Sequence, residues 1–151
     1  MRISPQYGTK EKLFEMFNKI NHLNENLSNS QEDKSEIIDN FIRYVGKKLN
    51  IDNKLPAISV NYKEGIAKEN KSFGGYNPET ETIEIIANKR NLADVLRTLA
   101  HEMVHHKQNI EGRLDNLSGK TGSDIENEAN SMAGIILREY GQKNPNIYDF
   151  F

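Results

Sequence analysis

Apolar residues recur at helical spacing in four stretches of the 151-residue chain. They fall three or four positions apart, which places them on one face of an α-helix. The pattern predicts helices over residues 10–23, 31–49, 91–110 and 123–140. Gly112 is expected to end the third helix, and Ser123 or Asp124 to cap the fourth. Gly141 and Pro145 are expected to stop the fourth helix.

Two shorter stretches alternate apolar and polar residues, which is typical of β-strands. They cover residues 57–62 and 82–87, and residues 63–75 between them are predicted to form a loop or a loose hairpin. The segment 73–78 is predicted to be a turn that leads into the second strand. Residues 77–80, Asn-Pro-Glu-Thr, are predicted to form the turn of an antiparallel pair.

These elements predict an α+β fold in a single small domain over residues 1–151. A short antiparallel or mixed sheet would pack on the helix over 91–110 and on the helix that follows it, with two more helices at the N-terminus. The expected segments are an arm (1–9), two helices (10–49), a small sheet (57–87), two further helices (91–110 and 123–140) and a tail (141–151).

Composition narrows the classes of function. The chain has 20 basic and 22 acidic side chains, so its net charge of -2 disfavours direct nucleic-acid binding. The absence of cysteine excludes disulfides and thiolate metal ligands. The chain shows no signal peptide and no apolar run of about 20 residues that would span a membrane. We expect a cytoplasmic protein, or a virion component if a phage encodes it.

The third predicted helix carries the motif HExxH, formed by His101, Glu102 and His105. Residues four positions apart project from the same side of a helix, so both imidazoles can reach one Zn²⁺ ion. Glu102 lies between them and is expected to act as the general base towards a metal-activated water. Both histidines fall opposite the apolar face of the helix, whereas His106 falls on that face. We therefore expect His106 to donate to a backbone carbonyl rather than to bind metal.

A catalytic zinc site needs a third protein ligand and an open position. Glu126 and Glu128 flank the apolar face of the fourth helix about equally, so periodicity leaves both as candidates. A carboxylate partner for one histidine is expected from Asp124 or Asp94. The candidates for stabilising the oxyanion of a peptide transition state are Tyr140, Tyr76, Tyr148 and Arg113.

The run Glu128-Ala129-Asn130-Ser131-Met132-Ala133 resembles the EANxFA helix of ImmA/IrrE-like metallopeptidases, and Asn127-Glu128-Ala129 resembles the NEA of gluzincins. Together with HExxH, the resemblance covers about residues 76–140 and implies a zincin-like fold. It implies Glu128 as the third zinc ligand. It further implies a peptidase whose protein or peptide substrate pairs with the strand over 82–87 as an edge of the cleft. The gluzincin Asp four residues after the ligand is Met132 here.

The leading hypothesis is therefore a zinc-dependent peptidase with Glu102 as its base. The alternative is a non-catalytic, metal-bearing structural or assembly protein that binds a partner, or itself, through the arm 1–9 and the apolar tail 147–151. A third hypothesis follows from the resemblance. Because ImmA/IrrE-like peptidases cleave repressors, the partner would be a transcription factor.

Overall fold

The computed structural model describes residues 33–63, 73–114 and 123–150. The chain divides at Glu36, and every element below except the first turn of one helix belongs to the unit Ile37–Phe151. The expected arm over 1–9 and helix over 10–23 lie outside the described residues, and the single-domain organisation stays a prediction. Residues 33–48 are helical, in agreement with the helix predicted over 31–49.

The sheet has three strands, β1 (Ala57–Asn61), β2 (Gly74–Asn77) and β3 (Thr82–Ile86), in the order β1-β3-β2. β1 pairs with β3 in parallel, and β2 pairs with β3 antiparallel. The α+β class with a small mixed sheet is thereby confirmed. The Asn-Pro-Glu-Thr turn does connect an antiparallel pair, with Glu81 in the left-handed region at φ 54°.

Two predictions about the sheet were wrong. Residues 74–77 form the strand β2 rather than a turn, because their backbone continues the ladder along β3. The strand over 82–87 was expected at the edge, but β3 is central and hydrogen-bonds to a neighbour on each side. An extended substrate therefore has no free edge on β3 to pair with, and β1 and β2 are the outer strands.

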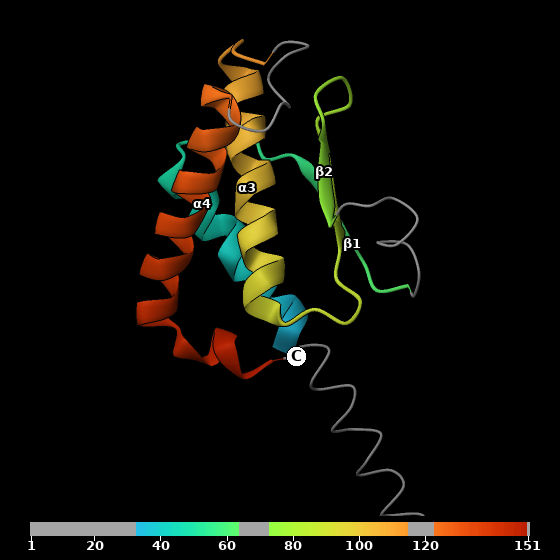
Figure 1. Cartoon of the computed structure of the whole chain (residues 1–151), viewed down its shortest axis with the longest axis vertical. Helices are drawn as coiled ribbons and strands as arrows, with labels where there is room; N and C mark the ends of the chain where they lie inside the picture. Colours follow the sequence, from blue (N-terminus) through green and yellow to red (C-terminus); the bar gives the residue numbers. More distant parts are fainter. Residues whose placement is uncertain (1–32, 64–72, 115–122, 151) are drawn as a thin grey trace, which may run out of the picture. The chain divides into compact units, whose positions relative to one another are not determined.

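The helix α3 (Leu92–Ile110) lies between the sheet and α4 (Asp124–Lys143), as Figure 1 shows. Asn91 caps its start by accepting a hydrogen bond from the Asp94 backbone N–H, and Gly112 follows its end with a φ of 71°. Residues 37–48 of the preceding helix lie behind α3 and α4 in this view, and Phe41 packs against Tyr140. The core they enclose includes Phe41, Val45, Ile83, Ile85, Leu96, Leu99, Met103, Val104, Ala129, Ala133 and Ile136.

The C-terminal segment returns to this core. α4 continues through Gly141 to Lys143, so the expectation that Gly141 stops the helix was wrong. The Tyr148 ring lies against Gly141 so closely that a Cβ there would collide with it, which gives glycine a packing reason inside the helix. The 3₁₀ helix η2 (Pro145–Asp149) then buries Ile147 completely. No helix in the described parts of the chain is long and apolar enough to cross a membrane.

Candidate metal centre

α3 presents His101 and His105 from adjacent turns on the side that faces α4. Leu96, Leu99 and Met103 anchor the opposite side and are fully buried, so packing fixes the rotation of the helix. The two histidine side chains are 16% and 12% exposed. Their Nε2 atoms lie 3.1 Å apart, which brings the two ring nitrogens towards one point.

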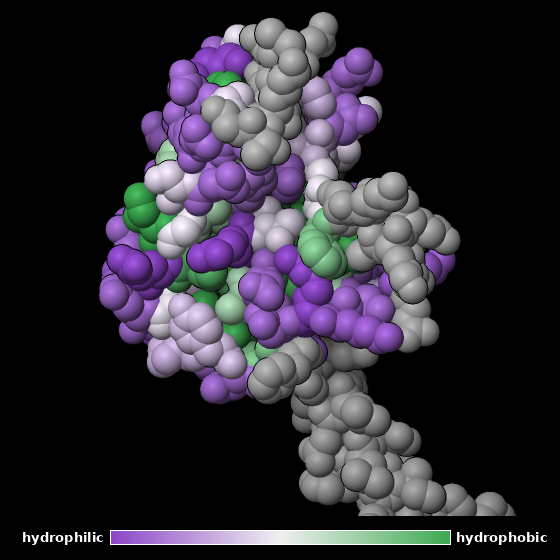
Figure 2. Space-filling view, viewed as in Figure 1, coloured by the Kyte–Doolittle hydropathy of each residue, from purple (hydrophilic) through white to green (hydrophobic). Residues whose placement is uncertain are grey.

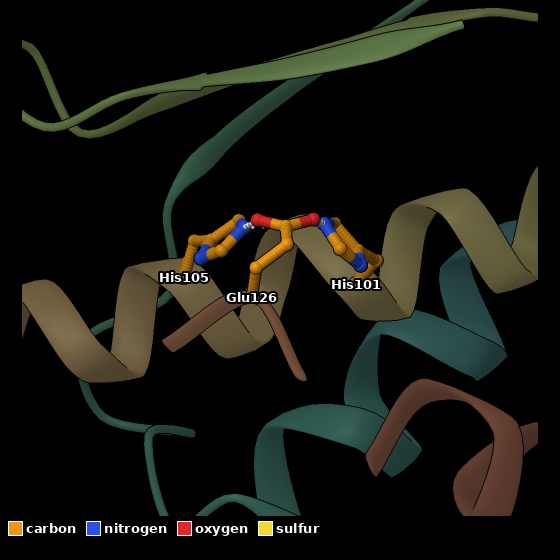
Figure 3. Close-up of side chains that lie close together, drawn as sticks. All are labelled: His101, His105 and Glu126. Atoms are coloured by element: carbon orange, nitrogen blue, oxygen red, sulfur yellow. Dashed lines mark hydrogen bonds and ion pairs between the residues drawn. The ribbon is translucent and has the colours of Figure 1, made fainter. Parts of the chain in front are cut away.

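Glu126, in the first turn of α4, completes this cluster. Its Oε1 lies 2.9 Å from His101 Nε2, and its Oε2 lies 3.2 Å from His105 Nε2. Figure 3 shows the carboxylate between the two rings, reaching across from α4. Ser123 caps α4 and accepts a hydrogen bond from the Glu126 backbone N–H, which fixes the turn that carries this side chain. Of the two residues predicted as alternatives for this cap, Ser123 is the one that forms it.

The structure does not bring Glu128 to the histidines, so the choice of Glu128 over Glu126 is corrected. Two residues along a helix correspond to a rotation of about 200°, which turns Glu128 away from the side that Glu126 faces. Both Glu128 oxygens pair with the Arg113 guanidinium at 2.9 Å, and Oε1 also accepts from Gln108 Nε2 at 3.0 Å. Periodicity had left Glu126 open, and only the resemblance favoured Glu128.

The donor set fits a tetrahedral zinc ion. Nitrogen and oxygen ligands bind zinc at about 2.0–2.2 Å, so two donors on a tetrahedron lie about 3.3 Å apart. The Nε2 atoms of His101 and His105 lie 3.1 Å apart, close to that value, and each lies 2.9–3.2 Å from a different oxygen of the Glu126 carboxylate. Among the described residues, His101, His105 and Glu126 form the one group of three such side chains near enough to one another to hold an ion.

The hydrogen bonds of Gln108 reveal the tautomer of His105. Gln108 Nε2 lies 3.0 Å from the Ile125 carbonyl and 3.0 Å from Glu128 Oε1, both of which only accept. The amide oxygen must then face His105 Nδ1, 2.8 Å away, and that nitrogen must carry the hydrogen. His105 Nε2 of the neutral ring is consequently an acceptor opposite the Glu126 carboxylate. Two acceptors facing each other at 3.2 Å repel unless a cation lies between them.

The partner of His105 is thus Gln108, and the expectation of Asp94 or Asp124 was wrong. Gln108 was not predicted as this partner. The signal was its position three residues after His105, on the same face. His101 forms a side-chain hydrogen bond with Asn130, while burial lowers the pKa of its ring despite the nearby Glu126 carboxylate.

Glu102 lies beside this cluster in a buried position. Its exposed fraction is 8%. Burial raises the pKa of the Glu102 carboxyl from 4.5 to about 7; the Glu126 carboxylate also raises it, and His105 opposes the shift. A buried carboxyl group whose pKa lies near neutrality is well matched to accepting and returning a proton.

His106 takes the structural role predicted for it. It is 1% exposed, and its Nε2 lies 2.7 Å from the Lys54 carbonyl. Its Nδ1 lies 2.7 Å from the Tyr76 hydroxyl, and that hydroxyl oxygen accepts a hydrogen bond from Asn109. Because Nε2 must donate to the carbonyl, Nδ1 of the neutral ring accepts from Tyr76.

The four side chains expected to stabilise the oxyanion make other contacts in the structure. Arg113 pairs with Glu128, and Tyr76 bonds to His106. Tyr140 packs its ring against Phe41, and Tyr148 lies against Gly141. A groove of about 810 Å³ runs between α3 and α4, and the side chains that line it include Arg97 and Asn130.

No protein-family model matches the chain, and neither a curated protein nor a solved structure matches it significantly.

Proposed function

We propose that this protein is a zinc-dependent peptidase, with His101, His105 and Glu126 as metal ligands and Glu102 as general base. The observation that carries the proposal is the convergence of two imidazole nitrogens and a carboxylate, with the two nitrogens 3.1 Å apart, near the separation of two ligands on tetrahedral zinc. Two histidines with one carboxylate favour zinc over harder cations such as Mg²⁺ or Ca²⁺. When bound, zinc would acidify a water molecule and polarise the carbonyl group of a peptide.

The side chains of the protein would hold the ion and transfer the proton. His101 and His105 offer their Nε2 lone pairs from one rigid helix, and Glu126 offers a carboxylate oxygen from the next. Three protein ligands leave a fourth position open, as catalytic sites require. Glu102 holds a proton-accepting oxygen beside the ligands, takes the proton of the attacking water and returns it to the leaving amine.

The first experiment measures zinc per chain in the wild type and in His101→Ala, Glu126→Gln and Glu102→Gln. We expect one zinc per chain in the wild type and in Glu102→Gln, and loss of stoichiometric zinc in the other two. Glu128→Gln makes the same chemical change two residues away on α4 and should keep one zinc per chain at saturation. Absence of stoichiometric zinc from the wild type after zinc is added back would contradict the proposal.

The second experiment measures peptide cleavage with a library of quenched fluorescent peptides. We expect cleavage by the zinc-loaded wild type and a loss of at least 100-fold in Glu102→Gln, because general-base catalysis contributes about 10²–10⁴-fold. Full activity in Glu102→Gln would refute the role of this residue.

One observation favours a second candidate, a metal-bearing protein without hydrolytic activity. Arg113, Tyr76, Tyr140 and Tyr148 all have other partners, so none of the predicted groups is aimed at an oxyanion. Hydrophilic residues cover most of the face drawn in Figure 2, and the apolar residues visible there lie in small separate patches. Ile147 is buried in the core, so partner binding through the tail would depend on exposed residues such as Tyr148. One zinc per chain without cleavage of any peptide would favour this candidate.

A further inference from the structure

Three residues outside the candidate ligand set form a continuous chain of hydrogen bonds that ends on a ligand. Arg113 donates two bonds to Glu128, Glu128 accepts from Gln108, and Gln108 accepts from His105. Arg113 follows the end of α3, Glu128 lies on α4, and Gln108 and His105 lie on α3. The chain therefore ties together both helices that carry the metal ligands.

Each member of this chain determines the orientation of the next. Gln108 is fully buried, so a reversed amide would place its oxygen against two acceptors, the Ile125 carbonyl and Glu128, with no water to compensate. Glu128 accepts hydrogen bonds from both the Arg113 guanidinium and the Gln108 amide, which holds it as the acceptor facing Gln108. A bidentate arginine also fixes the plane of the carboxylate.

We propose that Gln108, Glu128 and Arg113 are positioning residues that hold His105 in the tautomer that binds metal. With Nδ1 as the donor to Gln108, the lone pair of Nε2 points at Glu126 and His101. Without this acceptor, either ring nitrogen carries the hydrogen, and the tautomer with hydrogen on Nε2 cannot bind an ion through that nitrogen. The inference rests on the metal-binding part of the proposed function and not on hydrolysis.

This role explains why a glutamate that matches the ligand position of a known family pattern lies away from the histidines. Glu128 acts on the centre through Gln108, whereas Glu126 contacts both histidines directly. The same substitution should then have different effects at the two positions. Glu126→Gln removes a ligand, while Glu128→Gln weakens the support of one.

The test compares Gln108→Leu with Gln142→Leu, a matched change at an exposed glutamine of α4. Zinc affinity is measured by competition with a chromophoric chelator. The tautomer of His105 is read from ¹⁵N chemical shifts of the metal-free protein at a pH where the ring is neutral. We expect Gln108→Leu to bind one zinc per chain at saturation, with an affinity about 10–100-fold weaker. We expect its His105 to populate the tautomer with hydrogen on Nε2, and Gln142→Leu to match the wild type.

A rescue experiment separates positioning from general damage to the fold. Gln108→Glu keeps an acceptor for His105 but places its other oxygen against two acceptors, Glu128 and the Ile125 carbonyl, so affinity should fall. Adding Glu128→Gln turns one of these acceptors into a donor, and the double variant should bind zinc more tightly than Gln108→Glu. A double variant no tighter than Gln108→Glu would overturn the proposal.

Two further results would also overturn it. One is wild-type zinc affinity and wild-type tautomer in Gln108→Leu. The other is complete loss of stoichiometric zinc in Glu128→Gln, which would make Glu128 a direct ligand. A wild type that binds no zinc refutes the proposed function, and the metal-free tautomer of His105 still decides whether Gln108 orients the ring.

Discussion

The burial of Glu102 predicts a specific pH dependence of stability in the metal-free protein. Its folded-state pKa of about 7 lies above the ordinary value of 4.5, so the folded protein holds a proton that the unfolded chain releases. The stabilisation is fully present below pH 4.5 and is lost as the pH rises through 7. At about 1.4 kcal/mol per pH unit, the full effect is about 3 kcal/mol. Glu102→Gln cannot ionise and should lose this dependence.

We therefore expect Glu102→Gln to be more stable than the wild type at pH 8 by as much as about 3 kcal/mol, and to approach it near pH 4.5. Urea unfolding in the presence of a chelator, followed by circular dichroism from pH 4.5 to 8, measures the difference. Exposed Glu79 provides the control, because Glu79→Gln should follow the wild-type pH curve. Parallel curves for Glu102→Gln and wild type would refute the reasoning. Added zinc should shrink the difference, because a nearby cation stabilises the charged carboxylate.

Two further substitutions test the supports of the centre through unfolding and zinc titrations. Tyr76→Phe leaves Nδ1 of buried His106 and the Asn109 amide without their shared partner, so it should lower the free energy of unfolding by about 1–3 kcal/mol and leave one zinc per chain. Wild-type stability would show that this bond contributes nothing. Ser123→Ala removes the cap of the turn that carries Glu126, so it should cost about 1 kcal/mol and also weaken zinc binding. Unchanged zinc affinity would show that the Ser123 cap does not support the metal centre.

The parts of the centre that follow from local geometry were predictable from the sequence. His101 and His105 are four residues apart on one helix, so their convergence depends only on that segment being helical. His106 is one position further round, on the apolar side, and its burial follows from the same rotation. The start of α4 at Ser123 was predictable because a serine commonly caps a helix.

The order of strands in the sheet was not predictable in the same way, because pairing joins residues far apart in the chain. β3 has buried residues on both faces, Ile85 and Ile86 in succession, and runs of this kind are typical of central strands. The sequence was instead interpreted through a resemblance that placed this strand at the edge. β2 went unrecognised because Gly74 and Gly75 have low strand propensity, and only the ladder along β3 makes them extended.

Glu126 and Glu128 differ because the cationic side chain of Arg113 lies beside Glu128. Both are glutamates on the first turns of α4, and helix periodicity alone does not separate them. Arg113 follows α3 by three residues and pairs with Glu128 in a bidentate contact. A carboxylate neutralised by arginine is a poor ligand, since the guanidinium repels a metal cation that approaches the same oxygens. Glu126 has no arginine partner among the described residues and lies 2.9 and 3.2 Å from the two histidines, which makes it the proposed ligand.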